Sequence, residues 1–296
     1  MENNEPKKIS KTERLWAQAS DLSNPGRFMA MNALFHHLLK KNLEDEAISV
    51  GLEAINHLSE LEPGIGAQLA YVLSLKLEKN ERNDEALEAV EKAIWEYREA
   101  GNYLFKDLCH WQRAGFYWDI NMLMAIEDYK TAANVLIEQD NWEYTAVLWR
   151  NVARANREIK DFDEASKYAA KAITMLKEHS VMNGLPETYA EMAEIHDAAG
   201  NVTLSYKFLS KAIKVAKHRQ LNDYLSELKF RLAELKLQNG EEEEAITRLE
   251  KLSKHMDNPK QCKTAIQALE TLRNIYENHF EATKVAKIND LLNVIR

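Results

Sequence analysis

The chain has 296 residues, a formal net charge of −8 at pH 7, and only 9 glycines and 5 prolines. The excess of acidic side chains argues against a general nucleic-acid binder, which needs a basic surface to displace phosphate counterions. No apolar run approaches the roughly 20 residues that span a bilayer. The two cysteines, Cys109 and Cys262, lie too far apart for a disulfide framework and have no companions at zinc-ligand spacing. We therefore expect a cytoplasmic, all-α protein without membrane insertion.

The first residues differ in character from the chain that follows. Residues 1–10 (MENNEPKKIS) are polar and are predicted to form a disordered tail. Residues 11–22 are typical of one amphipathic helix, and residues 11–296 as a whole are predicted to form a single repeat domain. Its seven repeat units are predicted at residues 28–62, 66–101, 105–140, 143–181, 185–219, 223–257 and 260–296.

Small residues recur along the chain at a nearly constant interval. Seven helix starts are marked by Ala47, Ala86, Ala125, Ala165, Ser205, Ala245 and Ala282, which are separated by 39, 39, 40, 40, 40 and 37 residues. Most of them are followed two helical turns later by a second alanine on the same face, where small side chains let a neighbouring helix approach closely. A second series with the same period consists of Ser74, Ala114, Ala153, Ala193 and Ala233. Each unit is therefore predicted to be a pair of helices.

This combination resembles the tetratricopeptide repeat (TPR) family. In that family a helical hairpin carries a small residue in its first helix (helix A) and two alanines, two turns apart, in its second (helix B). The resemblance covers roughly residues 28–296 and implies a right-handed α-solenoid of about seven hairpins, a TPR-like superhelix. The period of about 40 exceeds the family's usual value of about 34, which implies longer helices. Two terminal units match poorly: the first has Ala33 or Leu34 in helix A, and the last has Glu270 where a small residue is expected.

Catalytic motifs are missing from the sequence. Neither a G-x-S-x-G elbow nor a phosphate-binding P-loop occurs. His36 and His37 are adjacent and point to different helix faces, so they cannot chelate one metal ion together. The carboxylates around His196 lack a second helix with an E-x-x-H motif, which favours an ion-paired or solvated histidine. We therefore predict a protein that is not an enzyme and that has no cofactor and no metal site.

The resemblance also implies where a ligand binds, because helix A lines the concave surface of such arrays. By this geometry the candidate groove residues are Trp111, Trp118, Arg150, Asn151, Arg154 and Arg157. The three arginines lie at helical spacing and can bind carboxylates bidentately, while the indole rings offer flat apolar contact area. The predicted partner is a protein or peptide segment with acidic and apolar residues.

A structural interpretation of the same residues stays open. The next helix A carries four acidic residues at matching heights, Glu187, Glu191, Glu194 and Asp197, which could pair with the arginines as a ladder between repeats. Exposed pairs of this kind contribute about 0–1 kcal/mol each. The two tryptophans could likewise pack between helices, as we expect for Trp149.

The leading functional hypothesis is a non-enzymatic scaffold or adaptor that binds a peptide segment or a partner helix in its concave groove. One alternative is a regulatory repeat protein that senses a peptide or a metabolite, although the output module usual for such arrays is not recognised. Another alternative is an adaptor of vesicle fusion, because the segment AIEDYKTAA (Ala125 to Ala133) is similar to the soluble attachment proteins of that process.

The last helix carries apolar residues on two faces. Packing on the previous unit explains one apolar seam, which consists of Val285, Ile288, Leu292 and Ile295. Leu291 and Val294 lie off this seam, which is the basis for predicting a homodimer through the C-terminal helix.

Overall fold

The described part of the chain folds into α-helices. The computed structural model describes residues 10–254 and 259–295, and within these ranges it contains fifteen α-helices, one short 3-10 helix and no strand. The predicted all-α class is thus confirmed. The predicted tail, residues 1–10, lies outside the described residues except for Ser10, which caps the first helix, α1 (Lys11–Ser20).

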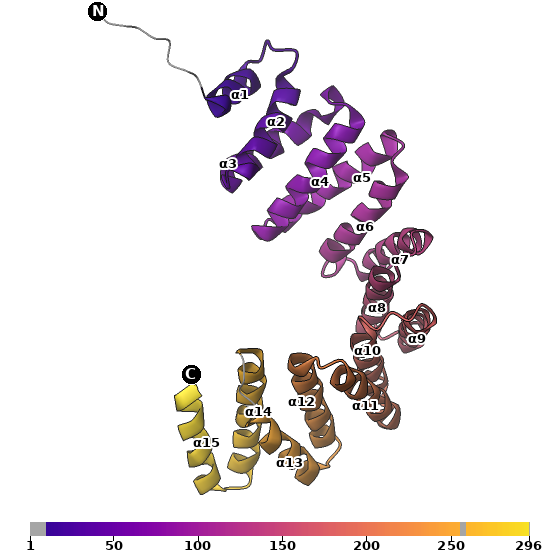
Figure 1. Ribbon diagram of the computed structural model, residues 1–296, viewed down its shortest axis with the longest axis vertical. Helices are drawn as coiled ribbons and strands as arrows, with labels where there is room; N and C mark the ends of the chain where they lie inside the picture. The colour runs from indigo at the N-terminus through magenta and orange to yellow at the C-terminus, as the bar shows by residue number, and fades with distance from the viewer. Residues whose placement is uncertain (1–9, 255–258, 296) are drawn as a thin grey trace, which may run out of the picture. The chain divides into compact units, whose positions relative to one another are not determined.

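Seven helical hairpins follow α1, as the two series of small residues predict (Figure 1). In each hairpin the first helix is helix A and the second is helix B. The hairpins are α2 (Arg27–Lys40) with α3 (Glu44–Ala54), α4 (Pro63–Lys79) with α5 (Asn83–Glu99), α6 (Tyr103–Tyr117) with α7 (Met122–Glu138), α8 (Trp142–Glu158) with α9 (Phe162–Glu178), α10 (Leu185–Ala198) with α11 (Val202–His218), α12 (Asn222–Gln238) with α13 (Glu242–Leu252), and α14 (Pro259–Asn278) with α15 (Ala282–Ile295). The 3-10 helix, Ile55–Glu60, follows α3.

The hairpins divide into two compact units. The first unit is Met1–Asn141, with α1 to α7, and the second is Trp142–Arg296, with α8 to α15. One hydrophobic cluster, between Leu15 and Cys109, lies in the first unit, and another, between Phe230 and Leu292, lies in the second. That the whole array is one domain stays a prediction.

Residues with left-handed backbone end many of the helices. The residues of this kind that close a helix in the described ranges are Asn42, Glu81, Gly101, Asp140, Lys160, Ser180, Gly200, Gln220, Gly240 and Phe280. In each case the next residue donates its N–H to the carbonyl five positions back, as Asp161 does to Asn156 at 2.8 Å. This is the Schellman arrangement, which satisfies the last carbonyls of a helix. Each helix therefore ends at a sharply defined residue. This keeps the helix length constant between units, as in α8 and α9, which both have 17 residues.

The two series of small residues are buried where helices meet. Ala47, Ala86, Ala125, Ala165 and Ala245 of the helix-B series are fully buried, and Ser205 is 2 % exposed. Ser74, Ala114, Ala153, Ala193 and Ala233 of the helix-A series are buried as well. Ala282, in the last hairpin, is exposed. The close approach predicted from the small side chains is therefore present in all but the last described hairpin.

In the two terminal hairpins, the helix-A position that is small in the other units is held by other residues than the sequence predicts. In four of the five inner units the small residue lies seven positions before a left-handed residue, as Ala153 lies before Lys160. The same count assigns Phe35, and not Ala33 or Leu34, to the first hairpin. It assigns Arg273, and not Glu270, to the last. Both residues also fit the period, since Phe35 lies 39 residues before Ser74 and Arg273 lies 40 residues after Ala233. The residues expected from the sequence were therefore out of register by one to three positions.

A glycine in the facing helix accommodates the large Phe35 side chain. Gly51 of α3 holds the position that Val90 and Ala169 occupy in other B helices. A Cβ atom at Gly51 would lie 3.1 Å from the Phe35 ring and 2.8 Å from Leu73 Cδ1. Phe35 is fully buried. The first hairpin thus exchanges a large and a small residue between its two helices, which preserves the dense packing that protein interiors require.

Candidate functional site

The two predicted tryptophans lie in the first unit. Trp111 is on α6, and Trp118 is the residue that ends this helix; both are half-buried. The Trp118 ring meets Tyr129 of α7 edge-on, with the ring centroids 6.4 Å apart. Trp149 of α8 is buried and stacks on Tyr168, with centroids 5.3 Å apart, in keeping with its predicted packing role.

The predicted basic residues lie on α8, in the second unit. This helix buries its apolar face, which leaves Arg154 exposed and Arg150, Asn151 and Arg157 half-buried. The four side chains come from successive turns of one helix, so α8 brings them together. The two tryptophans belong to the other unit, so the predicted groove residues form two separate sets.

Arg157 is held by carboxylates of the next helix A, α10. Its Nε donates to Glu191 Oε1 at 2.9 Å, and its Nη2 lies 3.0 Å from Glu194 Oε2. Glu194 also pairs with Arg231 of α12, whose Nη2 lies 3.3 Å from Glu227 Oε1. Charges of opposite sign therefore alternate across α8, α10 and α12, which is the arrangement that the ladder interpretation describes. Ligand binding by Arg157 stays a prediction.

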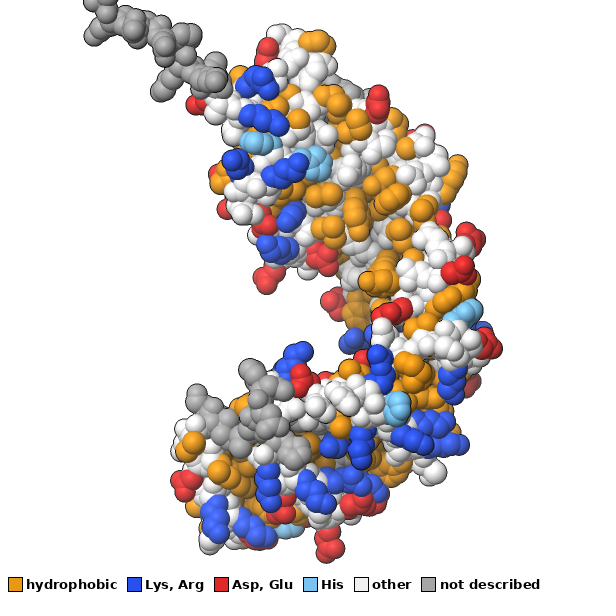
Figure 2. Space-filling model, viewed as in Figure 1, with side chains coloured by type: hydrophobic (Ala, Val, Ile, Leu, Met, Phe, Trp, Pro, Cys, Tyr) orange, Lys and Arg blue, Asp and Glu red, His pale blue; other side chains and the backbone are white. Residues whose placement is uncertain are grey.

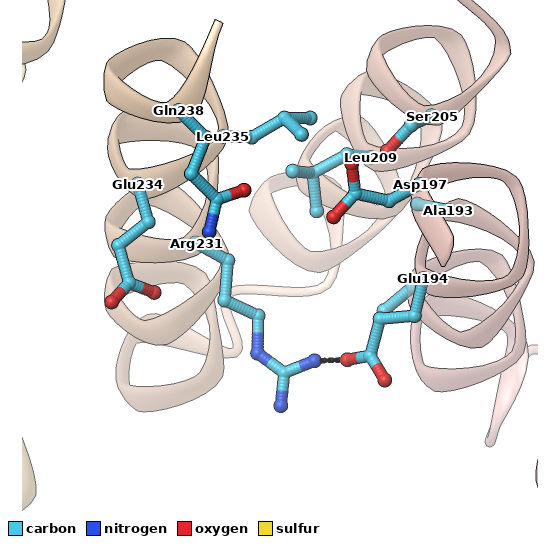
Figure 3. Close-up of a pocket in the computed structure, with 10 residues that line it drawn as sticks. Ala193, Glu194, Asp197, Ser205, Leu209, Arg231, Glu234, Leu235 and Gln238 are labelled. Atoms are coloured by element: carbon cyan, nitrogen blue, oxygen red, sulfur yellow. Dashed lines mark ion pairs between the residues drawn. The ribbon is translucent and has the colours of Figure 1, made fainter. Parts of the chain in front are cut away.

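A cavity of about 340 Å³ lies beside this ladder, between α10, α11 and α12. Its charged lining consists of Glu194, Asp197, Arg231 and Glu234, and Leu209 contributes apolar surface. Figure 3 shows Arg231 and Glu194 meeting between the two A helices, with Asp197 on the same side as Glu194 and Glu234 on the opposite helix. The cavity is thus open, and charged side chains of both signs line it together with apolar ones.

Negative charge predominates in this cavity. Three carboxylates face one guanidinium, which gives the charged lining a formal net charge of −2. Burial raises the pKa of Asp197 and also that of Glu234, where the Arg231 charge opposes the rise. Burial lowers the pKa of the Arg231 guanidinium, an effect that the carboxylates of Glu191 and Glu234 oppose. Neither Asp197 nor Glu234 forms an ion pair with another residue of the described ranges.

Ser205 adds a polar atom to the cavity wall at a position where the repeat otherwise carries alanine. The residue is 2 % exposed, and its hydroxyl has no hydrogen-bond partner among the residues that the structure describes. The similarly buried Ser226, by contrast, donates to the Asn222 carbonyl at 3.0 Å. The Ser205 oxygen faces the cavity and is not shut off from solvent. It can therefore bond water or a group that enters the cavity.

Sequence analysis did not single out Arg231, and it named Ser205 only as a small residue of the helix-B series. The groove positions implied by the family geometry do not include that of Arg231, two residues before the small Ala233. A signal was nevertheless present in the spacing, because Arg157 with Glu194 and Glu194 with Arg231 are both 37 residues apart. The Ser205 hydroxyl gave no signal, since serine is an ordinary replacement for alanine in a series of small residues.

A second charged cluster lies in the first unit, between α6 and α7. Asp128 is 5 % exposed and accepts hydrogen bonds from Arg113 Nε at 2.8 Å and Nη2 at 2.9 Å, and its Oδ1 lies 2.6 Å from His110 Nδ1. Burial opposes the ionisation of Asp128, but the hydrogen bonds from Arg113 and His110 outweigh burial and hold its pKa below the usual range. Burial also raises the pKa of the neighbouring Cys109 thiol to about 12, so this cysteine is not a nucleophile at neutral pH.

Surface chemistry differs between the two units. On the face shown in Figure 2, hydrophobic side chains gather over the middle of the first unit, whereas charged side chains of both signs cover the second. Exposed large apolar residues of the first unit include Trp95, Tyr103, Phe105, Ile120 and Leu123.

Residues 10–254 and 259–295 contain no group of three or more His, Cys, Asp or Glu side chains placed to hold a metal ion. In the same ranges, none of the helices combines the length and the apolar character that crossing a membrane requires.

Solved structures similar to this chain include repeat proteins of the tetratricopeptide type. A signal transduction ATPase with numerous domains and a tetratricopeptide repeat sensor, from Pyrococcus horikoshii, has a TM-score of 0.62 and 12% identity over 96% of this chain and 46% of its own. Aspartyl phosphate phosphatase F from Bacillus subtilis has a TM-score of 0.56 and 16% identity over 97% of this chain and 76% of its own. A Rap protein complexed with competence and sporulation factor has a TM-score of 0.50 and 14% identity over 98% of this chain and 87% of its own.

These similarities concern the fold. No protein-family description matches the sequence, and no curated protein does. At 12–16% identity, a structural likeness shows the fold alone. Together with the seven hairpins, it shows that the chain has a TPR-like α-solenoid fold.

Proposed function

We propose that this chain is a non-enzymatic scaffold or adaptor that binds an extended segment or a helix of a partner protein against the A helices of its second unit. The observation that carries the proposal is the row of solvent-accessible polar side chains on α8, namely Arg150, Asn151 and Arg154, beside the cavity between α10 and α12. Arginine forks suit carboxylates, and an asparagine amide can bond both a donor and an acceptor of a peptide backbone. The proposed partner segment therefore carries at least one acidic residue.

The ion pairs of Arg157 support this role because they hold the C-terminal end of α8 in place. Arg157 is bound to Glu191 and Glu194 of α10, one turn after Arg154. Arg150 and Arg154, one and two turns earlier, are the residues that we propose contact the partner. Trp111 and Trp118 remain in the proposal as apolar contact area on the first unit, since both are half-buried and retain accessible ring surface.

The first test is affinity capture from native lysate with the wild-type chain and the Arg150→Glu/Arg154→Glu variant, read by mass spectrometry. We expect at least one protein to be lost with the variant. A synthetic segment of that protein should then bind the wild-type chain at least tenfold more tightly in fluorescence anisotropy.

The matched control is Lys207→Glu/Lys214→Glu on α11, which makes the same change in charge at two exposed helix-B positions. This control should keep the captured protein. Identical sets of captured proteins from all three chains would contradict the proposal. Loss of helicity in the Arg150→Glu/Arg154→Glu variant would instead assign the arginines to the structural ladder.

A peptide sensor is the second candidate function. Among the similar structures, one is a Rap protein complexed with competence and sporulation factor and another has a tetratricopeptide repeat sensor. A sensor changes the arrangement of its hairpins when its ligand binds, because the ligand favours one of two states. Small-angle scattering would then give a smaller radius of gyration with peptide, whereas a scaffold keeps the same value. Catalysis is not part of either candidate, since the likeness to a phosphatase at 16% identity concerns the fold.

The proposal also includes a homodimer contact through α15. Ile288 and Leu292 are buried in the cluster around α14, whereas Leu291 is 49% and Val294 is 86% exposed. The side chain of Ile295, which was assigned to the buried seam, lies outside the described residues. A monomer mass in light scattering across micromolar concentrations would remove this part of the proposal.

The setting of the protein remains part of the proposal too. Both cysteines are free thiols, and Cys109 is buried. Free thiols suit a reducing compartment such as the cytoplasm, where we place the protein. The vesicle-fusion alternative stays a prediction that rests on the segment from Ala125 to Ala133.

A further inference from the structure

We infer that the cavity between α10, α11 and α12 is a subsite for one basic side chain, lysine or arginine, of an extended protein segment. This inference deepens the proposed function and rests on it. It adds a second recognition element to the segment, next to the acidic residue that the arginines of α8 would bind.

Charge complementarity selects a cation for this subsite. Arg231 is already engaged by Glu194 and Glu227, so it is not free to receive an acidic group. Asp197 and Glu234 have no ion-pair partner among the described residues, and they lie on the facing helices α10 and α12 (Figure 3). Burial raises the pKa of both carboxyl groups, which indicates that solvent stabilises their charges poorly. A cation placed between them would supply the missing compensation.

Ser205 adds a hydrogen-bonding group that is separate from the carboxylates. The residue is 2 % exposed, and its hydroxyl lies in the cavity wall without a partner among the described residues, at a helix-B position that is alanine in most other hairpins. Its oxygen is not shut off from the cavity, so it can bond water or a group that enters there. The hydroxyl oxygen can accept a hydrogen bond from an ammonium or a guanidinium group.

The size of the cavity suits a side chain. Its volume of about 340 Å³ is near the lower end of the range typical of ligand sites, roughly 300–1,000 Å³. Lysine has three donors and arginine five. The acceptors available are the carboxylates of Asp197 and Glu234, the Ser205 hydroxyl and the amide oxygen of Gln238. Leu209 and Leu235 offer apolar contact to the methylene groups of either side chain.

The test uses the full chain and four pools of fluorescein-labelled nonapeptides with neutral ends. The central residue is arginine, lysine, citrulline or glutamate, and the other positions are randomised over uncharged residues. Citrulline has the shape of arginine without its charge. We expect the arginine and lysine pools to bind at least tenfold more tightly than the citrulline pool in fluorescence anisotropy. Asp197→Asn/Glu234→Gln should reduce this preference to less than threefold.

Ser205→Ala is the most specific variant, because alanine is the residue that most other hairpins carry at this position. It should weaken binding of the arginine and lysine pools about threefold or more and leave the fold intact by circular dichroism. The charge-matched control is Asp163→Asn/Glu178→Gln, at two exposed positions of α9, which should keep the full preference.

Each other outcome would overturn the inference. If the citrulline pool binds as tightly as the arginine pool, or if the preference survives in Asp197→Asn/Glu234→Gln, the cavity does not hold the cation. Tight binding of the glutamate pool alone, lost in Arg150→Glu/Arg154→Glu, would refute the subsite and preserve the proposed function. Absence of binding by all four pools would refute both for linear segments. Binding of free argininamide as tight as that of the arginine pool would point to a small amine, and not a protein segment, as the ligand.

Discussion

At the scale of single residues, Gly51 is predicted to be essential for the packing of the first hairpin. A Cβ atom there would lie 2.8 Å from Leu73 Cδ1 and 3.1 Å from the Phe35 ring, and both side chains are fully buried. Gly51→Ala should therefore destabilise the protein by about 1–3 kcal/mol, as overpacking of a filled core does. Urea unfolding followed by circular dichroism measures the change.

Gly115 offers the matched control for this substitution. It lies in α6, also within a helix, and a Cβ atom there would meet nothing within 4 Å. Gly115→Ala should be neutral or stabilise by up to about 1 kcal/mol, because alanine favours the helix. In the double variant Phe35→Leu/Gly51→Ala, part of the lost stability should return. A Gly51→Ala variant as stable as the wild type would refute the proposed exchange of sizes.

Lys160 is predicted to strain the backbone at the end of α8. It adopts φ of 63°, a left-handed conformation that costs roughly 1–2 kcal/mol for a residue with a Cβ atom. Glycine removes this cost but adds unfolded-state entropy, an effect of about 0.5–1 kcal/mol. Lys160→Gly should thus stabilise the protein by about 0.5–1 kcal/mol, measured as a higher unfolding midpoint. Lys160→Ala, which retains the strain, should not, and equal midpoints for the two variants would count against the explanation.

At this scale the sequence predicted the small residues better than the special ones. Ala153 and its equivalents could be identified because the same contact between helices recurs in five successive units. Phe35 could not, because its fit depends on a glycine in another helix. The Ser205 hydroxyl could not be identified as a candidate binding group either, because the sequence does not show which groups surround it.

At the scale of helices, the Asp128 cluster is predicted to join α6 and α7 in a pH-dependent manner. The pKa of Asp128 in the folded protein lies below its unfolded value, because the hydrogen bonds from Arg113 and His110 outweigh the effect of burial. Its stabilisation is therefore present above the unfolded pKa, about 4, and is lost as the pH falls through the folded pKa. Asp128→Asn should cost about 3 kcal/mol at pH 7, since it leaves Arg113 without its buried partner.

The pH profile distinguishes this cluster from a merely structural hydrogen bond. The difference in unfolding free energy between the wild type and Asp128→Asn should shrink as the pH is lowered below 4, because the wild-type carboxyl group is then neutral as well. Asp163→Asn, at an exposed site in the first turn of α9, should cost less than about 1 kcal/mol at either pH. A difference for Asp128→Asn that does not vary with pH would contradict the assignment.

The ladder between A helices is predicted to stabilise more than the exposed ion pairs do. Arg157→Leu leaves Glu191, which is 8 % exposed, without its cation and should cost about 2–3 kcal/mol. Arg248→Leu breaks an exposed pair within α13 and should cost less than about 1 kcal/mol. Thermal or urea unfolding of both variants gives the comparison. Similar losses for the two would mean that the ladder adds no special stability.

The ladder also marks where prediction from the sequence stops at the scale of helices. The spacing of Arg150, Arg154 and Arg157 placed all three on one helix, but it could not tell which of them reaches a carboxylate of the next helix. That depends on how far α10 is displaced along α8, a distance of a few ångströms that the repeat period does not contain. In the structure, Arg157 reaches two of these carboxylates, Glu191 and Glu194.

At the scale of the whole molecule, the repeat architecture predicts that damage stays local. In such arrays each hairpin packs on its neighbours only, so stability is close to a sum of local terms. Two hydrophobic clusters agree, because one lies within the first unit and another within the second. Gly51→Ala should therefore speed hydrogen exchange in α2 to α5 and leave α12 to α15 unchanged. Leu249→Ala, which opens a cavity in the second cluster and should cost about 2–5 kcal/mol, should do the reverse.

Hydrogen exchange read by mass spectrometry after pepsin digestion would separate the two outcomes peptide by peptide. If each substitution accelerates exchange in its own unit only, residues 10–141 and 142–295 behave as separately cooperative parts. If either substitution raises exchange equally along the chain, the array unfolds as the single domain that the sequence predicts. The result bears on function as well, because a ligand bound at α8 to α12 can affect the first unit only if the two parts are cooperatively coupled.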